Sequence, residues 1–502
     1  MFSGNFNLFG LLWVLAYGAL TIIFLVFGLH RLWILFLYRR HGGPSAPPAG
    51  RFGILPVVTV QLPIFNEYYV AARLLRSVAA LDYPRDRLEI QVLDDSTDET
   101  QELLSTGVQA LRDEGFDATI IHRSERTGYK AGALANGMAL ARGELFLILD
   151  ADFVPTPDLL QCTVHYFTDA TVGMVQARWG HLNRDASWLT RAEAVLLDGH
   201  LLLEQTARSR SGRFFNFNGT AGLWRRAAIE DAGGWQHDTL TEDLDLSYRA
   251  QLSGWRFCFL PEVVTPAELP PDMEAFKSQQ HRWTKGSIQT CLKLLPRVWR
   301  SALPWPVKLE ALIHLTSNFS YLALPLLCLL ILPALGAEQN WTRFFLVDIP
   351  VFFGTTVSVV AFYLVAQREL RPDRWWRDVC LMPWVLAVGV GLSINNAKAV
   401  VEALAGYQTG FARTPKFADS ASTGRRYRLT GQVWVPIVEL AFALYFAFLI
   451  RFALQVGCYP PLPFLVLFCV GFAHAGMGSL WPRLLNWFEG RAGQTPEIAP
   501  AT

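Results

Sequence analysis

Residues 88–99 read LEIQVLDDSTDE, and the type of fold follows from this stretch. Its first half alternates apolar and polar residues as a strand does, and its second half holds acidic and hydroxyl residues that favour the start of a helix. A helical pattern follows at residues 99–112. A strand that runs into a helix is the repeating unit of an α/β fold, and it places Asp94 and Asp95 at the end of a strand, where open parallel sheets bind their ligands.

The same alternation extends on both sides of this stretch. Strand-like runs separated by helical segments predict an α/β domain with a parallel, doubly wound sheet. We expect this domain over residues 57–270, after a proline- and glycine-rich linker at 41–56. The predicted strands are 57–65, 88–95, 118–123 and 144–150, and the predicted helices are 67–80, 99–112 and 131–141.

The rest of the chain has the composition of a membrane protein. Hydrophobic residues make up 52% of the 502 residues and charged residues 17%, against about 25% in soluble domains. Residues 1–40 hold an apolar run that is too long for a signal peptide and has no basic leading segment, so they predict an uncleaved membrane helix. Four later apolar runs are long enough to span a membrane, at residues 309–335, 344–366, 433–456 and 462–481.

Basic residues predict how these segments are oriented, because they concentrate on the cytoplasmic side. The segment at residues 379–405 is apolar but has a polar second half. If it lies in the interface without crossing, and if the N-terminus is outside, all basic segments share one side of the membrane. We therefore expect five spans, a cytoplasmic α/β domain and a bacterial inner membrane as the location. The other predicted segments are amphipathic interfacial helices at 271–308, an interfacial helix with a loop at 379–432 and a cytoplasmic tail at 483–502.

A second acidic pair follows another predicted strand. LILDADF (147–153) places Asp150 and Asp152 at a strand end. Carboxylate oxygens suit Mg²⁺ or Mn²⁺, and these cations bind phosphate oxygens. One acidic pair alone would equally fit a helix cap. Two pairs at one edge of a sheet favour a site for a metal and a phosphate-containing ligand.

Two further motifs carry side chains that suit transfer chemistry. GYKAGAL (128–134) brings Lys130 to a helix start, where a diphosphate can bind. LTEDLDL (240–246) begins a helix, with Thr241 as the predicted N-cap and Glu242 and Asp243 in the first turn. These acids either complement the helix dipole or provide a general base for a hydroxyl group, which is a poor nucleophile at neutral pH.

As a set, the motifs resemble those of processive family 2 glycosyltransferases, the group of cellulose, chitin and hyaluronan synthases. The resemblance is closest to cellulose-synthase-like A and C proteins, which make mannan and glucan backbones. It is strong over residues 57–290 and looser in the membrane region. It implies a GT-A type domain, which is Rossmann-like with a mixed, mostly parallel sheet, followed by an α-helical transmembrane region. The stretches that carry it are QLPIFNE (61–67), QVLDDSTD (91–98), GYKAGAL (128–134), DADF (150–153), VQARW (175–179), FNGTAGLWR (217–225), TEDLDL (241–246) and QQHRW (279–283).

The family pattern implies a role for each matching residue. Arg282 would neutralise the leaving diphosphate, and Trp283 would stack under the acceptor sugar, although an interfacial tryptophan belt is the alternative for Trp283. The implied roles are the catalytic base for Asp243, beside Glu242; donor binding for Asp94 or Asp95, Lys130, Asp150 and Arg282; metal binding for Asp150 and Asp152; and acceptor binding for Gln279 and Trp283.

FARTPK (411–416) resembles the gating loop of cellulose synthases, with Phe411, Thr414 and Lys416 at matching positions. Arg413 departs from the valine of that pattern, so its contacts would differ. The alternative is a basic loop close to the membrane. In the family an interfacial helix precedes this loop, which agrees with the expected topology.

The resemblance implies an inverting, metal-dependent hexosyltransferase that polymerises a β-linked mannan, glucomannan or glucan and threads it through its own spans. GDP-mannose or UDP-glucose is the expected donor, and Mg²⁺ or Mn²⁺ the expected cofactor. The alternative is transfer of one sugar to a lipid such as ceramide or diacylglycerol. A scaffold with a decayed transferase domain is disfavoured because every motif acid is present. No nucleic-acid partner is expected.

Overall fold

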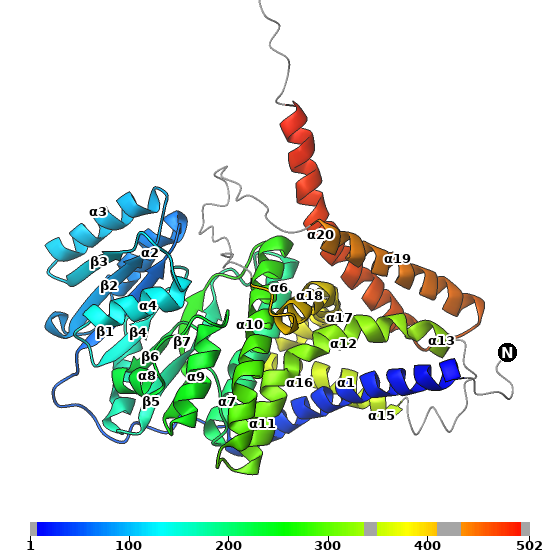
Figure 1. Cartoon of the computed structure of the whole chain (residues 1–502), viewed down its shortest axis with the longest axis horizontal. Helices are drawn as coiled ribbons and strands as arrows, with labels where there is room; N and C mark the ends of the chain where they lie inside the picture. Colours follow the sequence, from blue (N-terminus) through cyan, green and yellow to red (C-terminus); the bar gives the residue numbers. More distant parts are fainter. Residues whose placement is uncertain (1–7, 336–348, 409–432, 493–502) are drawn as a thin grey trace, which may run out of the picture.

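A computed structural model describes residues 8–335, 349–408 and 433–492. The described chain has two parts, an α/β domain at one end of the long axis and a group of long helices at the other (Figure 1). The N-terminal helix α1 (Leu8–His41) belongs to the helical part, and the following linker leads from it to the sheet.

Seven strands form one sheet in the order β3-β2-β1-β4-β6-β5-β7. The first four strands are mutually parallel, the sixth runs antiparallel between the fourth and fifth, and the seventh is parallel to the fifth. The predicted mixed, mostly parallel sheet is confirmed. The strands are β1 (Val58–Ile64), β2 (Leu88–Asp94), β3 (Asp117–His122), β4 (Leu145–Ile148), β5 (Val172–His181), β6 (Gly222–Arg225) and β7 (Arg256–Ala267).

Helices cover both faces of the sheet. These are α2 (Tyr68–Ala79), α3 (Thr100–Asp113), α4 (Tyr129–Leu140), α5 (Leu159–Thr163), α6 (Trp188–Asp198), α7 (Gln205–Arg210), α8 (Arg226–Asp231) and α9 (Glu242–Leu252), with the 3-10 turns η1 (Arg85–Arg87) and η2 (Val164–Thr168) and the π-helix η3 (Gly199–Glu204). In β4, Leu145 and Leu147 pack with α2 and α3, whereas Phe146 and Ile148 pack with α4 and α9. This alternation arises because successive strand side chains point to opposite faces.

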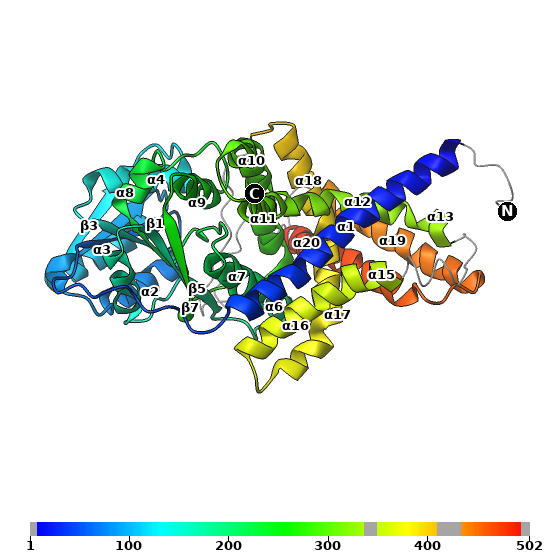
Figure 2. The same cartoon turned by 90° about the horizontal axis from the view of Figure 1, so that it is seen from below.

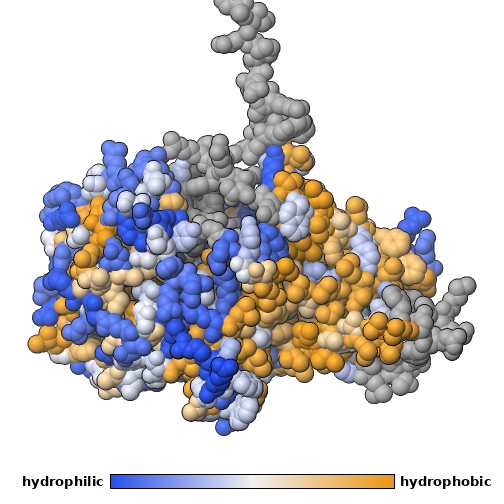
Figure 3. Space-filling view, in the orientation of Figure 1, coloured by the Kyte–Doolittle hydropathy of each residue, from blue (hydrophilic) through white to orange (hydrophobic). Residues whose placement is uncertain are grey.

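The helical part carries an apolar surface, and hydrophobic residues gather over it in Figure 3. Its elements are α10 (Met273–Arg300), α11 (Trp305–Thr316), η4 (Ser317–Phe319), α12 (Ser320–Leu329), α13 (Ile331–Leu335), α15 (Ile349–Phe352), η6 (Phe353–Val357), α16 (Ser358–Leu370), α17 (Trp375–Gly391), α18 (Ser393–Leu404), α19 (Trp434–Gln455) and α20 (Leu462–Ala492). Six described runs are long and apolar enough to cross a membrane: Gly10–His41, Trp305–Leu329, Pro350–Leu370, Trp375–Leu404, Trp434–Gln455 and Leu462–Leu484. These runs mark the chain as a membrane protein.

Two predicted segments differ in detail from the structure. The apolar run at 379–405 is not one helix, because α17 ends at Gly391 and α18 begins at Ser393. α18 lies across the long axis between the two parts, whereas α1, α12 and α19 run along it (Figures 1 and 2). The predicted tail at 483–502 is helical as far as Ala492.

Buried charges connect α1 to the α/β domain. Arg31 of α1 lies 2.5 Å from Glu204 of η3, and Glu204 lies 3.1 Å from Arg208 of α7. Arg208 Nε donates to Glu310 Oε1 of α11 at 2.9 Å, and Glu310 lies 3.0 Å from His30 of α1. Arg208 and Glu310 are each 2% exposed, so these ion pairs hold the domain against the helices in a fixed position.

We expect Arg208→Met to destabilise the folded protein by about 3–5 kcal/mol, because it leaves two buried carboxylates with fewer partners. The midpoint of thermal unfolding in detergent would fall clearly. Arg142→Met is the control, because the Arg142–Asp117 pair is exposed and such pairs contribute at most about 1 kcal/mol. Equal midpoints for the two variants would contradict a fixed domain–membrane interface.

Candidate active site

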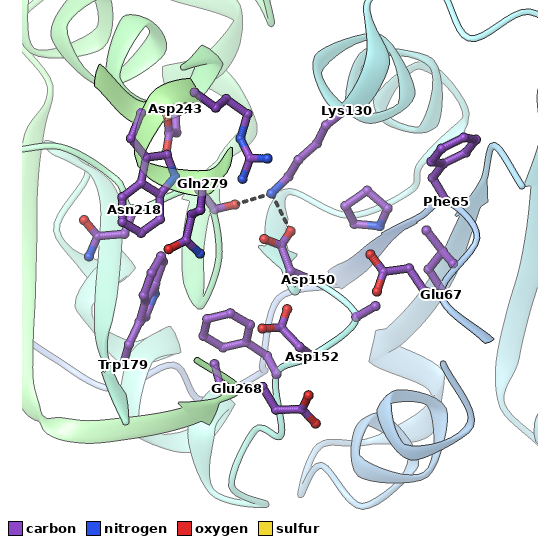
Figure 4. A pocket seen from close by; sticks show the side chains of 18 of the residues that line it. Phe65, Glu67, Lys130, Asp150, Asp152, Trp179, Asn218, Asp243, Glu268 and Gln279 are labelled. Atoms are coloured by element: carbon purple, nitrogen blue, oxygen red, sulfur yellow. Dashed lines mark hydrogen bonds and ion pairs between the residues drawn. The ribbon is translucent and has the colours of Figure 1, made fainter. Parts of the chain in front are cut away.

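One cavity opens where the carboxyl ends of β1, β4 and β5 face α9 and α10, and it holds about 1280 Å³ including its open mouth. This is the edge at which parallel sheets bind ligands. In Figure 4, Phe65 and Glu67 lie on one side of Asp150, whereas Trp179 and Gln279 lie on the other. The cavity therefore has two ends with an acidic centre between them.

The end beyond β1 and β2 contains Asp95. Both carboxylate oxygens of Asp95 accept from Arg123, at 2.8 Å from Nε and 2.5 Å from Nη2. Asp94 does not line the cavity, because its carboxylate accepts from the backbone of Ser96 at 2.9 Å and lies 2.9 Å from His122. The structure thus separates the two adjacent candidates and leaves Asp95 as the one at the cavity.

The same end has an aromatic and cationic wall that the sequence reasoning missed. The guanidinium of Arg126 lies 3.4 Å from the centre of the Phe65 ring. Both residues line the cavity, and so does Glu67, which comes from the turn after β1. A flat ring and a planar cation suit stacking with a planar group such as a nucleobase.

The centre of the cavity holds Asp150, Asp152 and Lys130. The ammonium of Lys130 donates to Asp150 Oδ1 and, at 2.9 Å, to the carbonyl of Gly219. Lys130 reaches this point because α4 starts two residues before the predicted 131, after Gly128 in a left-handed conformation with φ of 72°. Burial alone would lower the pKa of Lys130, but the carboxylates of Asp150 and Glu242 outweigh it and raise the pKa, so Lys130 is a cation.

Glu242 and Asp243 face this centre from the first turn of α9. Thr241 stands at the N-cap position as predicted, but its side chain does not cap the helix and lies 3.2 Å from the hydroxyl of Thr290. Gly219 permits close approach, because a Cβ there would lie 3.0 Å from Asp243 Oδ2. Burial, and then the charge of Glu242, raise the pKa of Asp243 to about 7.

The opposite end is formed by one face of α10. Gln279, Arg282 and Trp283 line the cavity, and their spacing of three and four residues puts them on the same side of the helix. The centres of the Trp283 and Trp179 rings are 6.5 Å apart, so two indoles stand together at this end. An aromatic pair of this kind suits the apolar face of a sugar ring.

The histidine of the QQHRW motif, His281, does not line the cavity. His281 lies 3.1 Å from Glu402 of α18, on a different side of α10. The motif therefore has one side toward the cavity and one toward the membrane helices.

Asp150 and Asp152 fit a hard divalent cation. Mg²⁺ and Mn²⁺ use oxygen ligands, and such ions are often held by only one or two carboxylates together with substrate phosphates. The described residues contain no group of three or more His, Cys, Asp or Glu side chains arranged for a metal. Glu268 also lines the cavity, but it lies 2.5 Å from Arg73, which leaves the two aspartates as the better ligands.

Sequence reasoning identified the acids and α10 but missed other wall residues. The missed ones are Phe65, Glu67, Arg126, Trp179, His181, Asn218 and Glu268. Four of them lie inside quoted motifs, which was their only signal, whereas Arg126, His181 and Glu268 lie outside those motifs and had none. The gating-loop residues Phe411, Thr414 and Lys416 lie outside the described residues.

The cavity joins an acidic centre that suits a divalent cation to a wall that suits a planar group, and comparison with known families adds the class of protein. Residues 56–286 match the family model described as "Glycosyltransferase like family 2". Every residue that lines the cavity falls within this range. Residues 56–286 therefore form a family 2 glycosyltransferase domain, and its sheet is of the GT-A type.

Similar proteins are known from plants and from an archaeon. Glucomannan 4-beta-mannosyltransferase 1 of Oryza sativa subsp. japonica is 40% identical over 287 residues, which are 56% of this chain and 54% of that protein. Glucomannan 4-beta-mannosyltransferase 2 of Arabidopsis thaliana is 42% identical over 251 residues, which are 49% of this chain and 47% of that protein. The chain thus matches about half the length of these curated relatives.

A solved structure shares the fold. The mannosyltransferase PcManGT from Pyrobaculum calidifontis, in complex with GDP-Man and Mn²⁺, aligns with a TM-score of 0.55. The alignment covers 79% of this chain and 100% of that one, at 22% identity. At this identity the likeness concerns the fold alone.

Proposed function

We propose that the chain is an inverting, metal-dependent hexosyltransferase that builds a β-linked polysaccharide from a nucleotide sugar. The observation that carries this proposal is the arrangement of one cavity around two sets of acids. Asp243, with a pKa of about 7, faces the centre where Lys130, Asp150 and Asp152 meet. A base near neutrality beside a site for a metal and a diphosphate is what glycosyl transfer to a hydroxyl group requires.

The reaction follows from these positions. Asp243 accepts the proton of an acceptor hydroxyl as its oxygen attacks the anomeric carbon of the donor. The new C–O bond forms on one face while the bond to the nucleoside diphosphate breaks on the other, so the anomeric configuration inverts. Lys130 and Arg282 stabilise the charge that develops on the leaving diphosphate. A divalent cation held by Asp150 and Asp152 would supply further charge neutralisation there.

GDP-mannose is the donor that we propose, with UDP-glucose as the alternative. The curated relatives at 40–42% identity are named glucomannan 4-beta-mannosyltransferases. The stacked wall of Phe65 and Arg126 would bind the base of the donor, with Asp95 nearby. Neither side chain alone selects between guanine and uracil.

A polysaccharide is the proposed product, because the acceptor end of the cavity carries two indoles, on α10 and β5, whose faces can bind the sugar rings of a glycan. Arg282 and Trp283 stand on α10, whose other side contacts α18 from the helical part. We propose that the run Trp375–Leu404, which holds α17 and α18, does not cross the membrane and that α18 lies in the interface. The other five apolar runs would cross, and the domain would be cytoplasmic. The product would then leave through the helices of the same chain.

The donor is tested with membranes that contain the expressed chain. Radiolabelled GDP-mannose and UDP-glucose are supplied in parallel, each with Mg²⁺, Mn²⁺ or EDTA. The proposal predicts cation-dependent incorporation from GDP-mannose and little from UDP-glucose. Incorporation from UDP-glucose alone would overturn the choice of sugar, and incorporation that persists in EDTA would overturn the metal dependence.

The raised pKa of Asp243 predicts the pH dependence of the reaction. The carboxylate is the active form, so kcat/KM falls as the pH drops below about 7 and the carboxyl becomes protonated. Glu242→Gln removes a neighbouring negative charge, so the pKa of Asp243 falls and the acidic limb moves to lower pH. The measurement is the pH profile of kcat/KM for both enzymes, and Asp231→Asn, on the surface, serves as the control. If the acidic limb of the kcat/KM profile did not move in Glu242→Gln, that limb would reflect a group other than Asp243.

A further inference from the structure

His181 stands on the cavity wall at the end of β5, and the reaction as described does not use it. Side chains two residues apart on a strand point to the same face, so His181 follows Trp179 on the side that faces the cavity. Both residues line the cavity, together with Leu197 from α6. His181 therefore belongs to the end of the cavity that contains the two indoles.

A buried aspartate orients the imidazole. His181 Nε2 lies 2.9 Å from Asp198 Oδ1, and Asp198 is 2% exposed. Asp198 Oδ2 accepts from Arg184 at 2.6 Å and from the side-chain amide of Gln367 at 3.0 Å. Despite its burial, these partners hold the pKa of Asp198 below its usual range, so the carboxylate is ionised and accepts from the ring.

This arrangement fixes the hydrogen-bonding pattern of the ring. Since Asp198 only accepts, Nε2 of His181 carries a proton, and Nδ1 of the neutral ring has a free lone pair. Among the described residues, the bond to Asp198 is the only hydrogen bond of the His181 side chain. A hydroxyl group entering the cavity would find an acceptor there whose direction is already set.

Asp198 does not need His181 as a counter-charge, since Arg184 provides one. Gln367 of α16 also accepts from Arg184, at 2.6 Å, so it holds both Arg184 and Asp198. The set therefore holds the ring of His181, which lines the cavity with its side chain 7% exposed, from a position that is anchored on a membrane helix. A side chain with this much support beside an aromatic pair suits recognition of a polar group on a ring that stacks there.

We propose that His181 is an acceptor-binding residue, whose Nδ1 accepts a hydrogen bond from a hydroxyl group of the acceptor sugar while Asp198 and Gln367 act as positioning residues. The proposal rests on the proposed glycosyltransferase function. It assigns His181 to binding of the acceptor and not to binding of the nucleotide, which the other end of the cavity would hold. Loss of His181 should thus change the acceptor KM and leave donor affinity unchanged.

Two amide variants separate this role from a structural one. In His181→Asn the side-chain oxygen takes the place near Nδ1, whereas in His181→Gln the amide nitrogen takes the place near Nε2. We expect His181→Gln, which keeps the bond to Asp198, to raise the KM for β-1,4-mannotetraose by about tenfold, the size of one lost hydrogen bond. His181→Asn should raise it less. The affinity for GDP-mannose should stay within about twofold in both variants.

The experiment measures transfer from GDP-mannose to the tetraose by the full-length protein in detergent, and donor binding by calorimetry. His165→Gln is the matched control, because His165 accepts from the backbone of Phe52 at 3.2 Å and does not line the cavity. An unchanged acceptor KM in His181→Gln, or a larger increase in His181→Asn than in His181→Gln, would overturn the proposal. Absence of transfer by the wild-type protein would instead count against the proposed function, so the two failures are distinct.

Discussion

Asp243→Asn should abolish glycosyl transfer while leaving donor binding intact. The amide has nearly the shape of the carboxylate but cannot take the proton of the attacking hydroxyl. General base catalysis contributes about 10²–10⁴-fold to such reactions, so kcat should fall by a factor in this range. The measurements are transfer from labelled GDP-mannose and the dissociation constant of the donor by calorimetry.

Asp238→Asn is the matched control for this variant. Asp238 lies in the loop before α9, is exposed, and pairs with Lys293 at 2.7 Å without lining the cavity. Its substitution should leave kcat within about twofold. If Asp243→Asn kept more than a tenth of the wild-type turnover, the assignment of the base would be wrong.

The second large effect is expected for Asp150→Asn combined with Asp152→Asn. The double variant should lose the increase in donor affinity that a divalent cation gives to the wild-type protein, together with nearly all transfer. In EDTA its affinity should equal or exceed that of the wild type, because Lys130 no longer pairs with a carboxylate at position 150 and can attract the diphosphate. Donor titrations with Mn²⁺, with Mg²⁺ and in EDTA measure this.

Asp158, which also follows β4 in the chain, provides the control for the double variant. Asp158 is exposed and does not line the cavity, so Asp158→Asn should keep the cation effect. A double variant whose donor affinity still rises with the cation would show that the ion is held by other groups. That result would show that the metal site is not at the end of β4.

The strands and the central acids were predictable because each depends on local patterns. Alternating or continuous apolar runs between turns predicted β1 to β4, and parallel strands bring their carboxyl ends to one edge, which placed Asp95 and Asp150 together. The antiparallel β6 was not predicted, since no separate hydrophobic pattern marks this short strand. It pairs with both β4 and β5 and so joins the two parallel groups of strands into one sheet.

Other features required the tertiary structure. Asp94 and Asp95 are adjacent, and sequence alone does not tell which one faces the cavity when the strand ends between them. The bend between α17 and α18 lies inside a continuous apolar run, where hydropathy gives no signal. Trp179 and His181 had no assigned role, because only the tertiary structure brings the end of β5 to the same cavity as Trp283. The two-sided arrangement of QQHRW, in contrast, already follows from helical spacing.

The most direct test of the central claim follows the product in sealed proteoliposomes that contain only this chain. GDP-[¹⁴C]mannose and Mn²⁺ are added outside, and proteins with the domain facing outward are the active ones. We expect ethanol-insoluble label that an endo-β-mannanase releases only after detergent opens the vesicles, because the polymer has crossed into the lumen. Label found only in the organic phase would contradict it, since the product would then be a glycolipid and the aromatic end of the cavity would not serve a growing chain.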